Sequence, residues 1–120
     1  MGRTLILLLL CAFACKREHH SPAKAQPLGN PARGRLLIEH FSCTACHVIP
    51  GIEGPRGMIG PSLQSIGTRT HIGGKVENTP ATMARWIQNP QAFDPGNPMP
   101  ALGINDADAR DIAEYLFTLK

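Results

Sequence analysis

Two cysteines and a histidine stand close together in the segment Cys43-Thr44-Ala45-Cys46-His47. This C-x-x-C-H spacing is the attachment sequence for c-type haem. Thiols three residues apart fall on one side of a turn, so both can form thioether bonds to the haem vinyl groups while the histidine reaches the iron from the same face. The segment therefore predicts covalent haem attachment through Cys43 and Cys46, with His47 as the first iron ligand.

Other chemistries use a similar cysteine pair. A thioredoxin-type redox pair should follow a strand in an alternating β/α pattern, and no such pattern is present. A zinc site would need a second pair of ligands, but the chain after residue 31 has no further cysteine, and His40 and His71 stand alone. A disulfide between Cys43 and Cys46 would close too short a loop to stabilise the fold much. Haem attachment is the prediction that remains.

A haem iron takes a second ligand on its opposite face or keeps an open site there. The candidate ligands are Met58, Met83, Met99, His40 and His71. Met99 stands between two prolines, which restrict the backbone and suit a weak thioether bond to iron. We expect Met99 to be the second ligand, with His71 and an open site as alternatives, and Met83 to belong to the core.

Three helices are expected to position these residues. Residues 30–31 and 79–80 each combine a capping residue, Asn or Thr, with a proline at the first helical position. The helix after residue 80 should end before Pro90. Asn105 is the expected cap of the last helix, whose first turn carries two aspartates that the helix dipole favours.

The composition limits how large a core this chain can build. It has 120 residues with 12 Gly and 11 Pro, so it allows one domain rich in loops. Between residues 42 and 79 the apolar residues are scattered, which predicts loop with one helical turn near 61–66. No alternating strand pattern is present, so the predicted fold class is all-α, with three main helices and long loops around a cofactor that completes a thin core.

The first 15 residues have the layout of a bacterial export signal, with Arg3 before a short apolar run from Leu5 to Ala14, which Cys15 follows. The run of about 10 residues is too short to span a bilayer of ~30 Å as a helix. Its ending resembles a lipoprotein signal, so we expect lipidation at Cys15, with ordinary cleavage or an uncleaved anchor as alternatives. Residues 16–30 are polar and aperiodic and are predicted to be a flexible tether to a domain at 31–120.

The formal net charge of +3 is unevenly distributed along the chain. Four of the 12 basic residues precede residue 31, but only one of the nine acidic residues does, so the predicted domain holds eight of each. A neutral domain lacks the basic surface that nucleic-acid binding needs, and we expect no nucleic-acid partner. The basic excess lies where an anchored tether would meet anionic lipid.

Residues 34–120 resemble the class I monohaem cytochromes c. The matching segments in chain order are Gly34, Cys43-x-x-Cys46-His47, Gly60-Pro61-x-Leu63, Trp86-Ile87-x-Asn89-Pro90, Asn97-Pro98-Met99-Pro100 and Asp111-Ile112-Ala113-x-Tyr115-Leu116. The resemblance implies the class I cytochrome c fold around one haem c, with the first and last helices crossing at Gly34 and Tyr115 packing at that crossing.

The resemblance also implies roles around the haem. The Pro61 carbonyl should accept a hydrogen bond from the His47 ring, which fixes the ring and raises its basicity. Trp86 should pack on the haem or donate to a propionate, with simple core packing as the alternative. Arg69 is expected to pair with the propionates, because arginine matches carboxylates in bidentate fashion, although a solvated surface arginine is the alternative.

With His47 and Met99 both bound, an iron has no open position, so we expect one-electron transfer, no enzyme activity and no small-molecule substrate. The expected protein is an electron carrier of a respiratory-type chain on the periplasmic side of the cytoplasmic membrane. Its expected partners are redox proteins such as a terminal oxidase or a quinol-oxidising complex. The alternatives are a haem sensor or peroxidase-like protein with a labile sixth ligand, and a fixed subunit of a dehydrogenase or oxidase complex.

Overall fold

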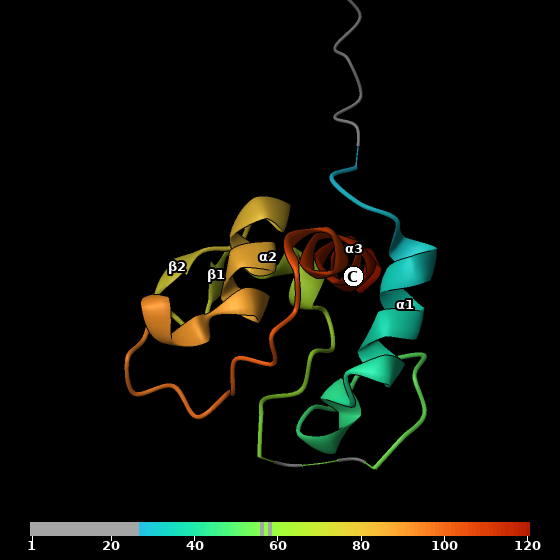
Figure 1. Cartoon of the computed structure of the whole chain (residues 1–120), viewed down its shortest axis with the longest axis horizontal. Helices are drawn as coiled ribbons and strands as arrows, with labels where there is room; N and C mark the ends of the chain where they lie inside the picture. The colour runs from blue at the N-terminus through green and yellow to red at the C-terminus, as the bar shows by residue number, and fades with distance from the viewer. Residues whose placement is uncertain (1–26, 56, 58) are drawn as a thin grey trace, which may run out of the picture.

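The computed structural model describes residues 27–55, 57 and 59–120 (Figure 1). The export signal with Cys15, most of the expected tether, and the candidate ligand Met58 lie outside the described residues. The elements in chain order are α1 (Pro31–His40), the 3-10 turn η1 (Cys43–Ala45), the 3-10 turn η2 (Ile66–Thr68), β1 (His71–Ile72), β2 (Val76–Glu77), α2 (Pro80–Gln88), the 3-10 turn η3 (Pro90–Ala92) and α3 (Asp106–Thr118).

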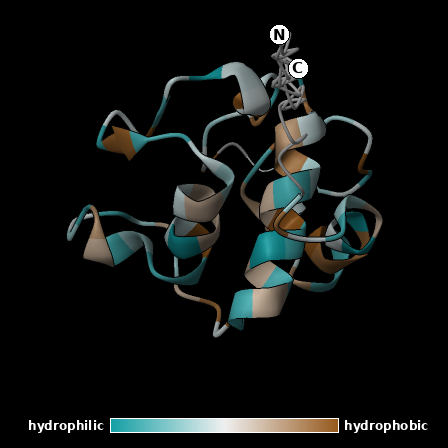
Figure 2. Ribbon diagram, turned by 90° about the horizontal axis from the view of Figure 1, so that it is seen from above, coloured by the Kyte–Doolittle hydropathy of each residue, from teal (hydrophilic) through white to brown (hydrophobic). Residues whose placement is uncertain are grey.

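The C-terminal helix α3 is the centre of the fold. It packs against both α1 and α2, and Figure 1 shows it almost end-on between them. Each of the three helices presents both hydrophobic and hydrophilic residues along its length (Figure 2), as expected for helices half-buried against a small core. The all-α class with three main helices, predicted from the sequence, is confirmed.

The three predicted helix caps are present. The side chain of Asn30 accepts hydrogen bonds from the backbone N–H groups of the first turn of α1. Thr79 accepts from the N–H of Thr82 at 3.1 Å, and Asn105 accepts from the N–H of Asp108 at 2.9 Å. Each cap satisfies a helix N–H that has no partner within the helix, a contribution of about 1 kcal/mol.

The crossing of α1 and α3 is very close at one residue. Gly34 lies against the backbone of Asp111 and Ile112, and a Cβ on Gly34 would overlap the Asp111 carbonyl. Only glycine allows this approach, so the predicted crossing at Gly34 is present. Tyr115 lies nearby, half-buried, and its hydroxyl donates to the Pro50 carbonyl at 3.1 Å, which ties α3 to the loop after the cysteines.

Two local predictions differ from the structure. The chain was expected to have no strand, but β1 and β2 form a short antiparallel hairpin with His71 opposite Glu77. Gly73 and Gly74 at its turn have φ of +55° and +68°, the left-handed backbone that a tight hairpin needs. The helical turn expected near 61–66 is found at Ile66–Thr68, as η2.

The residues just before α1 already contact the helical domain. The backbone N–H of Leu28 donates to the Glu114 carboxylate at 2.6 Å, and that of Asn30 donates to Asp111 at 2.7 Å. Residues 28–30, assigned from the sequence to the end of the tether, therefore contact α3. No helix among the described residues is long and apolar enough to cross a membrane.

Candidate haem site

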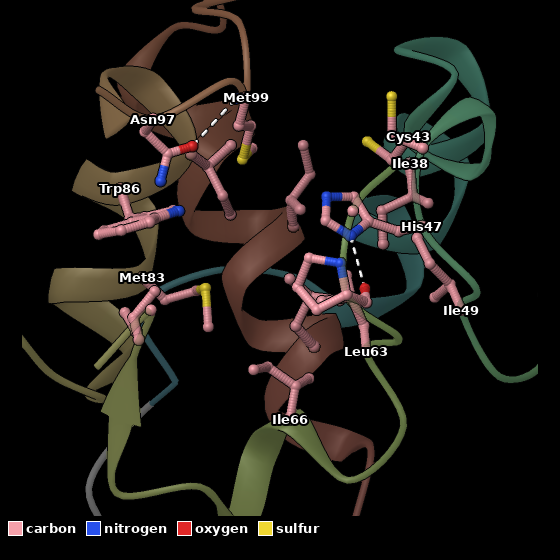
Figure 3. Close-up of a pocket in the computed structure, with 18 of the residues that line it drawn as sticks. Ile38, Cys43, His47, Ile49, Leu63, Ile66, Met83, Trp86, Asn97 and Met99 are labelled. Atoms are coloured by element: carbon pink, nitrogen blue, oxygen red, sulfur yellow. Dashed lines mark hydrogen bonds between the residues drawn. The ribbon is translucent and has the colours of Figure 1, made fainter. Parts of the chain in front are cut away.

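A cavity of about 310 Å³ lies among the three helices and the loops between them (Figure 3). Its aliphatic lining comes from all three helices, from the segment after His47 and from the loop before α3. These residues are Ile38, Ile49, Ile59, Leu63, Ile66, Ile72, Ile87, Leu102, Ile104, Ile112 and Leu116. Such a lining suits a large, mostly apolar ligand.

One wall of the cavity carries the C-x-x-C-H segment. After α1 the chain reverses at Ser42, whose left-handed backbone (φ +54°) starts η1. The N–H groups of Cys46 and His47 then donate to the Cys43 carbonyl at 3.2 and 3.0 Å, which closes a turn. The turn brings all three side chains to the cavity, and both thiols are free and half-buried. Burial raises the pKa of the Cys43 thiol.

The imidazole of His47 is held in one orientation. Its Nδ1 lies 2.8 Å from the Pro61 carbonyl, where the resemblance implied an acceptor. Because a carbonyl oxygen can only accept, Nδ1 carries the hydrogen, and Nε2 keeps its lone pair free to bind a metal. Gly60 lies close against this ring, since a Cβ there would overlap the imidazole.

The opposite wall presents two thioethers. Figure 3 shows the sulfur atoms of Met99 and Met83 on the other side of the cavity from the His47 ring. Met83, expected to be core, is 4% exposed and is both a core residue and part of the lining. Met99 stands in the loop between η3 and α3, half-buried.

The loop that carries Met99 is fixed by side chains on both sides of that residue. The Met99 N–H donates to the side-chain oxygen of Asn97 at 2.9 Å. The Gln91 side-chain amide donates to the Met99 carbonyl at 2.6 Å and to the Asn97 carbonyl at 3.0 Å. Sequence reasoning missed Gln91. The sequence signal for Gln91 is its position in the short turn that follows Asn89 and Pro90, where the capping residue Asn89 precedes a proline.

Of the other candidate site residues, three line the cavity and one does not. Trp86 is 7% exposed, lines the cavity and stacks on Phe93 with ring centres 5.8 Å apart. Arg69 and His71 lie at the edge of the cavity. His40 is exposed, its ring forms a T-shaped pair with the ring of Phe41, and it is absent from the cavity lining.

The side chains that could bind a metal or form covalent bonds indicate which prosthetic group this cavity can hold. Two free thiols and an oriented imidazole face thioethers across an apolar space, which fits a covalently attached haem with side-chain ligands on both faces. Among the described residues no group of three or more His, Cys, Asp or Glu side chains could hold a metal ion by itself. The thiols, imidazole and thioethers that line the cavity fit a haem.

Comparisons with known proteins agree. The sequence model of the family described as cytochrome c matches residues 31–120. The chain is 34% identical over 107 residues to cytochrome c2 of Rhodopila globiformis, covering 78% of this chain and 97% of that protein. It is 30% identical over 91 residues to cytochrome c2 iso-2 of Magnetospirillum molischianum, covering 65% of this chain and 91% of that protein.

A further similarity is to part of a larger protein. The chain is 34% identical over 89 residues to cytochrome c oxidase subunit 2 of Alkalihalophilus pseudofirmus, and the match covers 73% of this chain. It covers only 25% of that subunit. The segment similar to this chain is thus about a quarter of a polypeptide named as part of an oxidase.

Proposed function

This chain belongs to the cytochrome c family and carries one covalently bound haem c, and from that premise we propose that it is a mobile one-electron carrier of a respiratory-type chain. The haem supplies the reversible change between Fe(II) and Fe(III). The observation that carries the proposal is the pairing of an oriented His47 with Met99 on opposite walls of the cavity.

In this proposal each residue of the site has a defined task. Cys43 and Cys46 hold the prosthetic group covalently, and His47 offers Nε2 to the iron while Pro61 keeps its ring from turning. Met99 offers its sulfur from a loop that Gln91 and Asn97 brace. Two side-chain ligands leave no iron position for a substrate, which supports a carrier over an enzyme.

The lining supports the same function. A mostly apolar cavity keeps water from the iron, and a thioether ligand favours the reduced state, so both raise the reduction potential. Trp86 closes one side of the cavity with its indole ring. These features suit a carrier that accepts one electron from a quinol-oxidising complex and passes it to a terminal oxidase.

The oxidase is the partner for which the comparisons offer the best support. A segment similar to this chain occurs within a protein named cytochrome c oxidase subunit 2, where it is part of the same polypeptide. We propose that the present chain passes electrons to a terminal oxidase. At the cavity, Ile59 is 78% exposed and Leu102 is 43% exposed, so an apolar contact of the small, transient kind is proposed there.

The proposed location follows from the N-terminal sequence. Residues 1–15 would direct export, and lipidation at Cys15 would hold the domain at the periplasmic side of the cytoplasmic membrane. Since residues 28–30 contact α3, the proposed tether is residues 16–27, for which a flexible chain has an r.m.s. reach of ~20 Å, and it would let the domain move between membrane complexes. Membrane fractionation of the wild type and of Cys15→Ser tests the anchor.

One experiment separates the carrier from the alternatives. The purified full-length holoprotein is reduced, mixed with carbon monoxide, and then with membranes that contain a terminal oxidase. A carrier is expected to show no change of its spectrum with carbon monoxide and rapid oxidation by the membranes. Stoichiometric carbon monoxide binding without oxidation by the membranes would instead identify a sensor or a peroxidase-like protein.

A further inference from the structure

The β1–β2 hairpin lies beside α2 and against the edge of the Trp86 indole (Figure 1). A Cβ on Gly73, in the hairpin turn, would come within 2.8 Å of the Cη2 atom of Trp86. Trp86 in turn stacks on Phe93, with the two ring planes 25° apart. Because Phe93 directly follows η3, these apolar contacts connect the hairpin to the start of the loop that carries Met99.

An ion pair joins the hairpin turn to the same loop. The Lys75 ammonium lies 3.8 Å from the Oδ1 atom of Asp94, the residue after Phe93. The pair is open to solvent, since 52% of the Lys75 side chain and 29% of the Asp94 side chain are exposed. An exposed pair of this kind adds little to the stability of a whole fold. A specific role must therefore come from the other contacts of the Asp94 carboxylate.

The second oxygen of that carboxylate is connected to Met99 through one side chain. The Nδ2 of Asn97 donates to Asp94 Oδ2 at 3.3 Å, and Asn97 Oδ1 accepts the Met99 N–H at 2.9 Å, the upper dashed line in Figure 3. Turning the Asn97 amide over would place its oxygen against the carboxylate and its NH₂ group against the Met99 N–H. Asp94 therefore fixes the one amide orientation that can hold Met99.

We infer that Lys75 and Asp94 are positioning residues for Met99, because their ion pair clamps the hairpin to the Met99 loop and, through Asn97, keeps the Met99 sulfur in the cavity. The inference rests on the proposed function, in which Met99 is an iron ligand. It adds to the brace from Gln91 a second one that depends on charge and comes from a different part of the fold.

The clamp should weaken when its two charges are screened. The screening length falls from ~10 Å at 0.1 M salt to ~3 Å at 1 M, which is shorter than the separation of the Lys75 and Asp94 charges. The contacts of Gly73, Trp86 and Phe93 are apolar and do not depend on this attraction. Salt therefore separates the contribution of the ion pair from that of the packing of the hairpin.

The test measures imidazole binding to the oxidised full-length holoprotein in the wild type, Lys75→Met, Asp94→Asn and the double variant. Imidazole occupies the iron position only when the Met99 sulfur leaves it, so its affinity reports how firmly the loop is held. Lys75→Met keeps the apolar stem without the charge, and Asp94→Asn keeps an oxygen that can accept from Asn97. Each single variant should bind imidazole about two- to fivefold more tightly, the range for an exposed pair. The double variant should bind no more tightly than either, because the pair acts as a unit.

Two matched variants and one change of condition control the measurement. Lys75→Arg keeps the charge and should bind imidazole as the wild type does. Asp106→Asn breaks an exposed pair with Arg110 that is outside the cavity lining, and it should also leave the affinity unchanged. Salt at about 1 M should raise the wild-type affinity to that of Lys75→Met while leaving the affinity of Lys75→Met unchanged.

Equal imidazole affinities in the wild type, Lys75→Met and Asp94→Asn would overturn the inference. Single effects that multiply in the double variant would also overturn it, as would a salt effect that Lys75→Met shares with the wild type. The far-red absorption band of the oxidised protein, which reports a methionine–iron bond, separates this inference from the proposed function. If the wild type shows the band and the affinities are equal, the inference fails and the carrier stands. If the wild type lacks the band, the proposed function fails and the inference with it.

Discussion

Gly34 of α1 and Asp111 of α3 meet backbone to backbone, with no room between them for a single methyl group. The Asp111 side chain also accepts the N–H of Asn30 and pairs with Arg33. One residue of α3 thus fixes both the start of α1 and its crossing. Because Cys43 follows three residues after α1 ends, this contact also sets how far the cysteine wall of the haem cavity stands from α3.

Replacing Gly34 with alanine should destabilise the protein. The added Cβ must push the helices apart, which costs about 1–3 kcal/mol, and this outweighs the gain in helix propensity of about 1 kcal/mol at most positions. Gly96→Ala is the control, because a Cβ there meets no atom within 4 Å. Urea unfolding should show a loss for Gly34→Ala and a change within about 0.5 kcal/mol for Gly96→Ala. If Gly34→Ala and the wild type had equal free energies of unfolding, the contact between α1 and α3 at Gly34 would be looser than described.

The Asp111 carboxylate should make stability depend on acid pH. Burial by itself raises the pKa of Asp111, but the hydrogen bonds from Asn30 and Arg33 outweigh it and hold the pKa below the usual 3.8. A lowered folded-state pKa stabilises the fold above pH 3.8, and that stability is lost as the pH falls through the folded-state value. At pH 7 Asp111→Asn should therefore cost roughly 1 kcal/mol, after allowance for solvent screening.

The comparison to make is urea unfolding of the wild type and Asp111→Asn at neutral pH and again near pH 3. The difference between the two proteins should shrink in acid. Asp106→Asn, in an exposed pair with Arg110 on the same helix, is the control and should show little effect at either pH. A difference for Asp111→Asn that is the same at both pH values would show that its pairing is not the cause.

Gln91 should control how firmly Met99 is held. Gln91→Ala removes two hydrogen bonds to the backbone around Met99, each worth about 1 kcal/mol. Added imidazole, which competes with the thioether for the iron, should then bind up to about 30-fold more tightly, since 1.4 kcal/mol corresponds to a factor of ten. Gln64→Ala, at an exposed glutamine whose side chain makes no such contact, should leave imidazole binding unchanged. An unchanged imidazole affinity in Gln91→Ala would show that Gln91 does not control how firmly Met99 is held.

The apolar residue Ile59 should govern docking with a redox partner. Ile59→Asp should slow electron transfer to a terminal oxidase, because a charge in an apolar contact must be desolvated. Leu36→Asp is the matched control: Leu36 is 60% exposed on α1 and is absent from the cavity lining. Stopped-flow oxidation rates should also vary only weakly with salt in the wild type, since Arg69 is the one permanently charged side chain among the described residues that line the cavity. Equal slowing by both variants would place docking elsewhere.

The sequence predicted those parts of the fold that depend on neighbouring residues. The caps Asn30, Thr79 and Asn105 and the C-x-x-C-H turn are local patterns, and each is found where its residues indicated. The hydrogen bond from His47 to Pro61 came from the resemblance, not from local chemistry, because the two residues meet only in the folded chain.

The remaining features depend on tertiary contacts that no short pattern encodes. Met83 has the helical spacing of a core residue, and only the folded structure brings its sulfur to the same side of the cavity as that of Met99, across from the His47 ring. The β1–β2 hairpin rests on two glycines and two residue pairs, too short for a strand pattern. Asp111 lies within a helical motif, so its contacts with the start of α1 could not be anticipated.

The most direct test of the electron-carrier account is the far-red absorption band of the oxidised holoprotein, measured in the wild type, Met99→Ala and Met83→Leu. Both methionines lie across the cavity from His47, so the second variant is a matched control. The account predicts a band in the wild type that is lost in Met99→Ala and retained in Met83→Leu. A band that survives in Met99→Ala, or a wild type with high-spin iron and no band, would contradict it.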